Sequence, residues 1–525
     1  MTKPNLKRLA VSATLLLLSN AAQAATPASK VTANAAARFL EQASFGPIPT
    51  TIADIQTAGF SAWIDSQIAL DKTKWSPIPD PSVDAKGNTS LTPAQDAFFL
   101  YAHFGQDQLR QRVAFALGQI WVTSGVKLSP DAIVPYQRLL QADAFATFDK
   151  IMYDLTLSPA MGHYLDMVNN NKATAGHSPN ENYAREILQL FTLGLYQLDA
   201  YGRVMKDSKG VPVPSYSQDV IEGFAAAFTG WTYAPKPGAT SHFGNPSNWA
   251  APMVAFENNH DKAVKVLLNN HQLPANQTAD ADLKAALDNI FHHSNVGPFI
   301  CRQLIQRLVT SNPSDAYVKR IADVFNQRPR GNLAAVVKAI LLDPDARKGD
   351  DGSENTTTKL REPALWISAF LRGLNAQVLA VNSLPNATSQ LGQNIYYPPT
   401  VFNYFHPGYD ISLSPTQTYN APEFELLSEA TAASAADLIN TLVYGGVNGV
   451  TVDLTPYITP LGLKPGAVEI GKLLDGLNTN LMGGRMPADM RATIIKACTA
   501  QTSPKAMAQT AVYLIGSSWN YQVER

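Results

Sequence analysis

The sequence has few of the features that mark a metal-dependent or nucleophilic enzyme. It holds only two cysteines, Cys301 and Cys498, in 525 residues, and two isolated cysteines do not form the thiolate cluster of a usual zinc site. Both stand at apolar positions of predicted helices, which indicates buried thiols, although a single disulfide between them stays open. The chain also has no Gly-x-Ser-x-Gly elbow, no His-Glu-x-x-His helix and no phosphate-binding loop. The cofactor therefore stays unknown, and no enzyme class is indicated.

A large charge of one sign is also missing. The chain has 41 basic and 42 acidic residues and a mean hydropathy of -0.10. This balance argues against a nucleic-acid partner, and no run of like charge indicates binding to a membrane surface. Beyond the first residues, no apolar run approaches the roughly 20 residues that span a bilayer. We expect no integral membrane segment after the leader is removed.

The N-terminus has the pattern of a secretory leader. Lys3, Lys7 and Arg8 precede an apolar stretch over residues 9–18, and Ala22-Gln23-Ala24 forms a small-x-small cleavage signature. The stretch is too short for a membrane anchor. We expect residues 1–24 to be a signal peptide and the mature chain to begin at Ala25. The mature chain would keep 38 of the 41 basic residues against all 42 acidic ones, and would be periplasmic or extracellular.

Helical periodicity predominates along the mature chain. Leu109, Val113, Leu117 and Trp121 recur on one helix face. Similar patterns cover residues 34–44, 50–70, 92–123, 131–157, 281–292, 297–309, 315–327, 332–343, 360–374, 421–442 and 504–516. Short strands or hairpins are expected near 195–214, 251–268 and 447–457. The predicted fold class is mainly α, a multi-helix packed array with a few short β-hairpins.

The length predicts more than one lobe, since 501 mature residues exceed what a single core usually organises. Loop composition marks residues 72–91, 233–250 and 346–358. We expect an N-terminal helical lobe over 25–345, which carries the motifs below, and a C-terminal helical lobe over 346–525. The latter contains an aromatic and proline-rich segment, 376–420, which either packs on the surface or lines a cleft.

The clearest predicted helix start is Ser178-Pro179-Asn180-Glu181. Ser178 could cap the helix, Pro179 suits its first position, and Glu181 would complete a capping box. Gly194 would end the helix. Asn182, Arg185, Glu186 and Gln189 then fall on one face.

The run Asn180-Glu181-Asn182-Tyr183-Ala184-Arg185-Glu186-Ile187, with Leu190, Thr192, Leu193 and Gly194, resembles the signature stretch of the family called domain of unknown function 1800. Phe191 departs from it, because many relatives are expected to carry histidine there. Further matches occur at Arg38-Phe39-Leu40, Ser44-Phe45-Gly46-Pro47, Trp63, Gln67, Leu109-Arg110-Gln111-Arg112-Val113-Ala114, Pro159-Ala160-Met161, Tyr164-Leu165, Tyr216-Ser217-Gln218-Asp219-Val220, Thr229-Gly230-Trp231, His260-Asp261, Lys265, His293, Pro298, Arg361-Glu362-Pro363, Pro398-Pro399, Val401-Phe402 and Tyr513-Leu514.

The resemblance covers residues from about 35 to 525. It implies an exported, largely helical bacterial protein. It also implies a partner, because similar proteins are often encoded beside a second exported family that resembles alkaline phosphatases and sulfatases. It supplies no reaction.

Polar residues of these blocks are the candidates for chemistry. Arg185 could bind a carboxylate or phosphate, while Glu186, Asp219 and His260 could transfer protons. For Arg185 and Glu186, a solvated helix face or an Arg–carboxylate clamp between helices is the favoured interpretation. Asp219 in the first turn of a helix that begins after Ser217 could serve only the helix dipole. The candidate ligand-binding residues are Asn182, Arg112, Lys265, Tyr397 and His406.

The last two belong to an aromatic stretch, residues 396–406, that could stack on a sugar or peptide or could be core. No metal site is predicted. His292-His293 lacks partners at metal-ligand spacing, and the oxygen-rich group around His163 and Asp166 lacks the spacing of a calcium loop.

Two functions remain open from the sequence. The favoured one is an exported binding or accessory protein that works with another secreted protein or a surface polymer. The alternative is a hydrolase or lyase that uses the charged residues of the motif blocks on a polar substrate. Because isolated buried charges are costly, we also expect Arg185 or Arg112 to pair with a carboxylate from another block, at or under a cleft. Glu186 and Asp219 are the first candidates.

Overall fold

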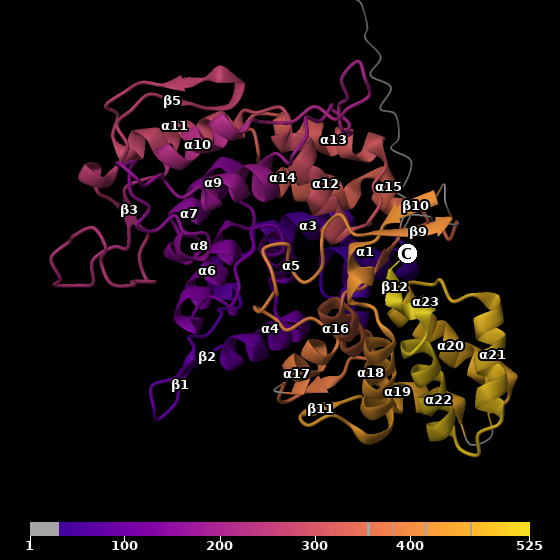
Figure 1. The fold of residues 1–525 in the computed structure, drawn as a ribbon. Helices are drawn as coiled ribbons and strands as arrows, with labels where there is room; N and C mark the ends of the chain where they lie inside the picture. Colours follow the sequence, from indigo (N-terminus) through magenta and orange to yellow (C-terminus); the bar gives the residue numbers. More distant parts are fainter. Residues whose placement is uncertain (1–30, 354–357, 382, 415–416, 463–464, 525) are drawn as a thin grey trace, which may run out of the picture. The chain divides into compact units, whose positions relative to one another are not determined.

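The computed structural model describes residues 31–353, 358–381, 383–414, 417–462 and 465–524. The predicted leader lies outside these ranges. Helices make up 54% of the described residues, and several two-stranded antiparallel sheets accompany them (Figure 1). The predicted fold class is therefore confirmed. No helix in the described ranges has the length and apolar character needed to cross a membrane.

The first half of the chain contains a series of short helices. They are α1 (Ala33–Ala43), α2 (Pro49–Ala58), α3 (Phe60–Ile68), α4 (Thr92–Phe104), α5 (Gln108–Gly118), α6 (Pro130–Asp143), α7 (Phe148–Leu157), α8 (Pro159–Tyr164), α9 (Asn182–Glu186) and α10 (Gln218–Ala227). A π-helical turn, Ile187–Thr192, continues α9. Longer irregular stretches follow α8, this π-helical turn and α10. Two long predicted helices are each divided in two, 50–70 at Gly59 and 92–123 at Gly105.

The second half repeats this pattern. Its helices are α11 (Ala279–Phe291), α12 (Val296–Leu308), α13 (Asp315–Asn326), α14 (Leu333–Leu342), α15 (Pro344–Arg347), α16 (Pro363–Gly373), α17 (Ser383–Gln390), α18 (Glu429–Asn440), α19 (Thr455–Ile458), α20 (Ala467–Met482), α21 (Ala488–Thr499), α22 (Pro504–Gly516) and α23 (Trp519–Gln522). Most have an N-cap or Pro start that the sequence supplies, such as Thr278 before α11 and Ser314 before α13.

The strands are short and pair in twos. The pairs are β1 (Ser82–Val83) with β2 (Thr89–Ser90), β3 (Trp231–Thr232) with β4 (Val254–Ala255), β5 (Lys265–Val266) with β6 (Gln272–Leu273), β7 (Lys359–Leu360) with β12 (Val523–Glu524), β8 (Gln377–Val378) with β11 (Val450–Thr451), and β9 (Asp410–Ser414) with β10 (Gln417–Asn420). Isolated bridges join Tyr196 to Pro214 and Leu198 to Val204, within the predicted 195–214 hairpin region.

The signature helix begins later than predicted. Asn170 accepts a hydrogen bond from the Asn180 N–H at 2.8 Å and donates one to its carbonyl at 3.1 Å. These contacts keep residues 178–181 out of the helix, which starts at Asn182. Glu181 makes no cap and instead accepts from Arg185 at 2.8 Å and from Gln218 at 2.9 Å. The predicted capping box is therefore wrong.

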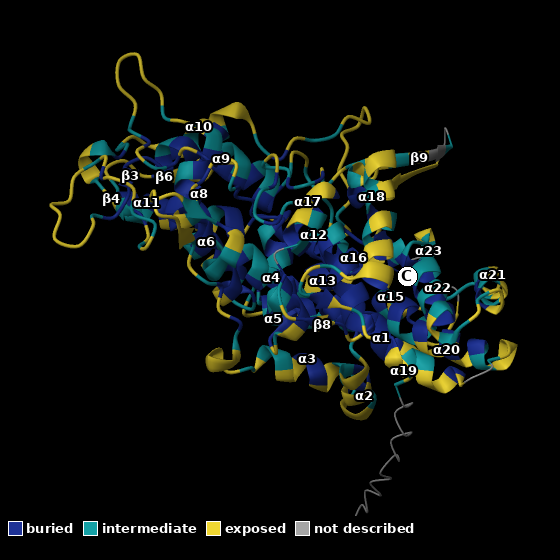
Figure 2. Ribbon diagram, turned by 90° about the horizontal axis from the view of Figure 1, so that it is seen from below, coloured by how far each residue is buried: buried dark blue, intermediate teal, exposed yellow. Residues whose placement is uncertain are grey.

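Apolar side chains gather in two large buried clusters. One draws its buried residues from between Ala36 and Ala346, and the other from Phe99 and from between Ala364 and Tyr521. Helix α16 is buried over nearly its whole length (Figure 2). Cys301 and Cys498 are buried free thiols. The boundary between lobes at 345 stays a prediction.

Several charged side chains form a buried cluster in the interior of the protein. Its members are all at most 7% exposed: Arg38, Glu41, Arg112, Arg307, Lys359, Arg361, Glu362, Glu423 and Glu524. Arg361 donates to Glu41 and to the Tyr521 carbonyl. Lys359 lies 3.4 Å from Glu423. We call this group the ionic core. Several segments that carry the family resemblance supply it, so much of their charge serves the fold.

Candidate functional site

A cavity of about 570 Å³ adjoins the ionic core, a volume within the range of small-ligand sites. Its wall comes from four regions of the chain: the end of α5, the segment after α9, helix α12, and the loops that flank β9 and β10. The lining residues are Gln119, Ile120, Gln189, Leu190, Gly194, Leu195, Tyr196, Phe299, Arg302, Gln303, Gln306, Ser311, Asn312, Pro313, Val401, Phe402, His406, Pro407, Gly408 and Asn420.

Helix α12 gives the cavity a polar wall. Phe299, Gln303 and Gln306 fall on one helix face because residues three, four and seven apart align on an α-helix. Across from them, Gln189 and Leu190 come from the π-helical turn, a distortion often found at functional sites. Leu190, Gly194, Val401 and Phe402 belong to segments that carry the family resemblance, so those segments build part of this wall.

An aromatic pair stands at the cavity. The rings of Phe402 and His406 stack with centroids 4.8 Å apart and planes at 29°. Phe402 is half-buried and His406 is exposed. The backbone N–H of His406 donates to Glu425 at 2.5 Å. The contact with Glu425 anchors the pair, which therefore offers a fixed apolar surface to the cavity.

Two amide side chains in the wall carry polar atoms without a partner. Gln119 is 3% exposed, and its Nε2 donates to Glu362 of the ionic core at 2.5 Å. Its Oε1 is buried and has no hydrogen-bond partner among the described residues. The same holds for Nε2 of Gln303. Because buried polar groups are normally paired, both atoms point to a missing partner.

The charge of the wall is small. Its lining residues include no carboxylate. Arg302 lines it, but this guanidinium lies 3.5 Å from Asp315 and donates to the Tyr201 carbonyl at 3.3 Å. Burial lowers the pKa of Arg302, and the Asp315 carboxylate partly restores it. The cavity therefore presents amides, aromatic rings and a cation that is already paired.

The sequence-predicted residues Arg185 and Glu186 lie apart from this lining set. Arg185 pairs with Glu181 of the same segment at 2.8 Å, so its expected partner from another block is wrong. Burial raises the pKa of Glu186, and the nearby Arg185 opposes this. The carboxylate in turn raises the pKa of Tyr164 and Tyr216 beyond the effect of their burial.

Asp219 and Lys265 line a second cavity of about 480 Å³ together with Glu181, Glu222 and Asp261. Asp219 is exposed and stands in the first turn of α10. Lys265 is 2% exposed and donates to the carbonyls of Asp261 and Ala263 at 2.8 and 2.9 Å. Its ammonium is thus turned inward, away from a ligand.

His260 is buried in an ion cluster with Asp282 and Lys265. Its Nε2 lies 2.9 Å from the Asp282 carboxylate, and its Nδ1 lies 2.9 Å from the Thr229 carbonyl. Lys265 lies 2.7 Å from the same carboxylate. Both ring nitrogens of His260 are therefore occupied by protein oxygens, and neither is free to contact a substrate.

The other predicted ligand-binding residues are spread out. Arg112 is fully buried and donates to the Arg307 carbonyl at 2.6 Å. Burial lowers its pKa, and Glu362, Glu524 and Glu423 oppose this, so the carboxylates near it are not the expected Glu186 or Asp219. Asn182 bonds Asp166 at 3.0 Å.

Tyr397 packs against Gly125, where an added Cβ would lie 2.7 Å from its ring. Of the nine predicted site residues, His406 alone appears in the lining of the 570 Å³ cavity. Phe191, the departure from the family pattern, stacks on Trp121 with centroids 4.6 Å apart.

In the described ranges, no three His, Cys, Asp or Glu side chains gather in a way that could hold a metal ion. His163, at the centre of the weak calcium pattern, bonds the Tyr233 hydroxyl at 2.7 Å.

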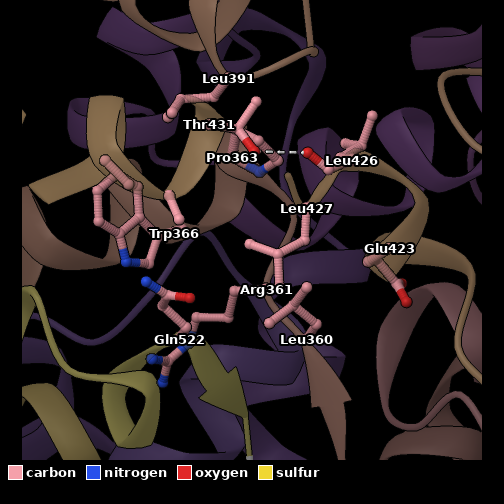
Figure 3. Close-up of a pocket in the computed structure, with 12 residues that line it drawn as sticks. Leu360, Arg361, Pro363, Trp366, Leu391, Glu423, Leu426, Leu427, Thr431 and Gln522 are labelled. Carbon is pink, nitrogen blue, oxygen red and sulfur yellow. Dashed lines mark hydrogen bonds between the residues drawn. The ribbon is translucent and has the colours of Figure 1, made fainter. Parts of the chain in front are cut away.

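A third cavity, of about 50 Å³, is lined by Glu423 and by mostly apolar residues. Figure 3 shows Trp366, Leu391 and Leu427 around it, with the Thr431 hydroxyl bonded to the Leu426 carbonyl. This volume accommodates little more than one or two water molecules. We therefore interpret the third cavity as a gap in the packing.

The fold and the cavities define a mainly helical protein with a ligand-sized, amide-rich cavity set against a buried ionic core. The family model described as "Protein of unknown function (DUF1800)" matches residues 38–523, and the chain belongs to this family. No curated protein and no solved structure matches the chain.

Proposed function

We propose that this protein is an exported binding protein that holds a polar ligand in the 570 Å³ cavity and acts as an accessory to another exported protein or a surface polymer. The observation that carries the proposal is the buried Gln119, whose Oε1 has no partner among the described residues and which shares a wall with the Phe402–His406 pair. A wall with unmet hydrogen bonds and an aromatic surface favours ligand binding. A co-encoded exported phosphatase- or sulfatase-like protein is the proposed partner.

Removal of the aromatic surface tests this proposal. Phe402→Ala should reduce retention of the purified protein on washed envelopes of its own cells at least tenfold, because truncation of a central aromatic anchor commonly costs that much binding. Phe104→Ala is the matched control, since Phe104 is 59% exposed, contacts a histidine ring likewise, and is not part of the cavity wall. Equal retention of Phe402→Ala and the wild type would contradict the proposal.

Export itself has a simple test. The N-terminal sequence of protein recovered outside the cytoplasm should begin at Ala25. Recovery of the full-length chain from the cytoplasm alone would remove export from the proposal.

A hydrolase or lyase remains the second candidate, and one observation favours it. Burial raises the pKa of Glu186, and a raised pKa is what a general acid requires. The Oε2 of Glu186 also has no partner within the described part of the chain. Turnover of a polar substrate that falls at least a hundredfold in Glu186→Gln would replace the binding proposal with this one.

A further inference from the structure

We infer that the ligand of the 570 Å³ cavity is a neutral saccharide chain, and that Gln119 determines specificity by accepting a hydrogen bond from one of its hydroxyl groups. This inference rests on the proposed function, because it names the ligand class of the same cavity. The cavity wall supports it in three independent ways.

The contact with Glu362 fixes the orientation of the Gln119 side-chain amide. The Glu362 carboxylate lies 2.5 Å from the Gln119 amide and also accepts from Gln393 at 2.5 Å. A carboxylate accepts hydrogen bonds and cannot donate them when ionised, so the NH₂ group of Gln119 must face it. The Oε1 atom is then the group left over. A ligand that satisfies it has to donate, as a hydroxyl or an N–H does.

Gln303 calls for the opposite hydrogen-bonding role in the ligand. Its Nε2 donor is buried and unpartnered in the described structure, and it stands on the α12 face that lines the cavity. A ligand group that accepts a hydrogen bond would satisfy this donor. Hydroxyl groups both donate and accept, so a polyhydroxylated ligand meets both demands without carrying charge. Gln189 adds a further amide to the wall, whereas the amides of Asn312 and Asn420 already bond other protein groups.

The aromatic part of the wall favours a sugar, because a pyranose ring has a flat apolar face. The stacked Phe402 and His406 rings present a π surface whose negative face attracts the weakly positive C–H groups of a pyranose ring. The lining residues contain no carboxylate that would select a cation. Arg302 is occupied by Asp315 and the Tyr201 carbonyl, which weakens its attraction for an anion. Neutral ligands are therefore preferred over acidic ones.

Calorimetric titration of the full mature chain tests the ligand class. The probes are neutral hexasaccharides of α-glucose, β-glucose, N-acetylglucosamine, mannose and xylose, hexagalacturonate as an acidic chain, and a neutral hexapeptide of Ser, Asn and Gly. We expect at least one neutral saccharide to bind at least tenfold more tightly than hexagalacturonate and the peptide. Tighter binding of the peptide or of hexagalacturonate would overturn the inference, as would binding of none of the saccharides.

Two variants test the roles of the amides with the saccharide that binds best. Gln119→Met and Gln303→Met should each weaken binding by about 5- to 30-fold, the usual effect of losing one buried hydrogen bond. Gln327→Met is the control, because Gln327 is exposed and is not part of the cavity wall. Gln303 has no internal partner to lose, so its variant stays informative if Gln119→Met does not fold. Unchanged affinity in Gln303→Met and in any folded Gln119→Met would overturn the inference.

The two proposals fail separately. If the envelope retention depends on Phe402 but the saccharides do not bind, the ligand class is wrong and the binding cavity stands. If a saccharide binds equally well to the wild type and to Phe402→Ala, the cavity is not the site, and both proposals fall.

Discussion

Asp282→Asn is expected to lower the free energy of unfolding by about 3–5 kcal/mol, the usual cost of removing one partner from a buried ion pair. Asp282 is fully buried, and its carboxylate lies 2.9 Å from the Nε2 of His260 and 2.7 Å from the Lys265 ammonium. Burial raises the pKa of Asp282, but the hydrogen bonds from His260 and Lys265 outweigh this and hold it below its usual range. Asparagine keeps the shape and leaves the buried Lys265 ammonium with only the more distant Asp261 carboxylate, 3.9 Å away.

The control lies two residues away on the same helix. Asp280→Asn removes a carboxylate that pairs with Lys284 at 2.7 Å, with both side chains about half exposed, and should change stability by no more than about 0.5 kcal/mol. Urea unfolding followed by circular dichroism measures both variants. Similar small losses for the two would contradict the role assigned to the buried ion cluster.

Gly223→Ala is expected to destabilise the protein by about 3 kcal/mol through overpacking. Gly223 lies in α10, which packs against β5. A Cβ at this position would stand 2.1 Å from the Val266 carbonyl oxygen and 3.0 Å from its carbon. These are backbone atoms, so the strand must move, and Lys265 beside it would move away from Asp282.

Gly476→Ala is the matched control for that substitution. Gly476 also lies inside a helix, α20, but an added Cβ would meet only the Tyr457 ring at 3.9 Å, an ordinary contact. Alanine should therefore stabilise this helix by up to about 1 kcal/mol. Thermal unfolding compares the two variants. A Gly223→Ala protein as stable as Gly476→Ala would show that α10 and β5 do not pack as closely as described.

Helices are the part of this fold that the sequence predicts well. The apolar period finds α1, α5, α12 and α22 because buried apolar residues recur in each at helical spacing. The apolar period does not predict α20. Gly471 and Gly476 interrupt the apolar pattern there, although Leu473, Leu474 and Leu477 are buried in the structure. The apolar period also misplaces the signature helix, because Asn170, ten residues before Asn180, decides that start by a tertiary contact.

The candidate site is much harder to predict. Gln119, Gln303 and His406 come from distant segments, and only the packing of α5 and α12 brings the first two into one wall. A glutamine in a helix carries no sign that its amide lacks a partner. The residues that attract attention in the sequence, such as His260 and Arg112, prove to be buried in ion clusters that support the fold.

A crystal structure of the protein with the tightest-binding neutral hexasaccharide tests the central claim most directly. The account predicts a sugar ring on the Phe402–His406 pair and a ligand hydroxyl within hydrogen-bond distance, about 2.7–3.2 Å, of Gln119 Oε1. A saccharide bound elsewhere, with the 570 Å³ cavity holding only water, would contradict the account.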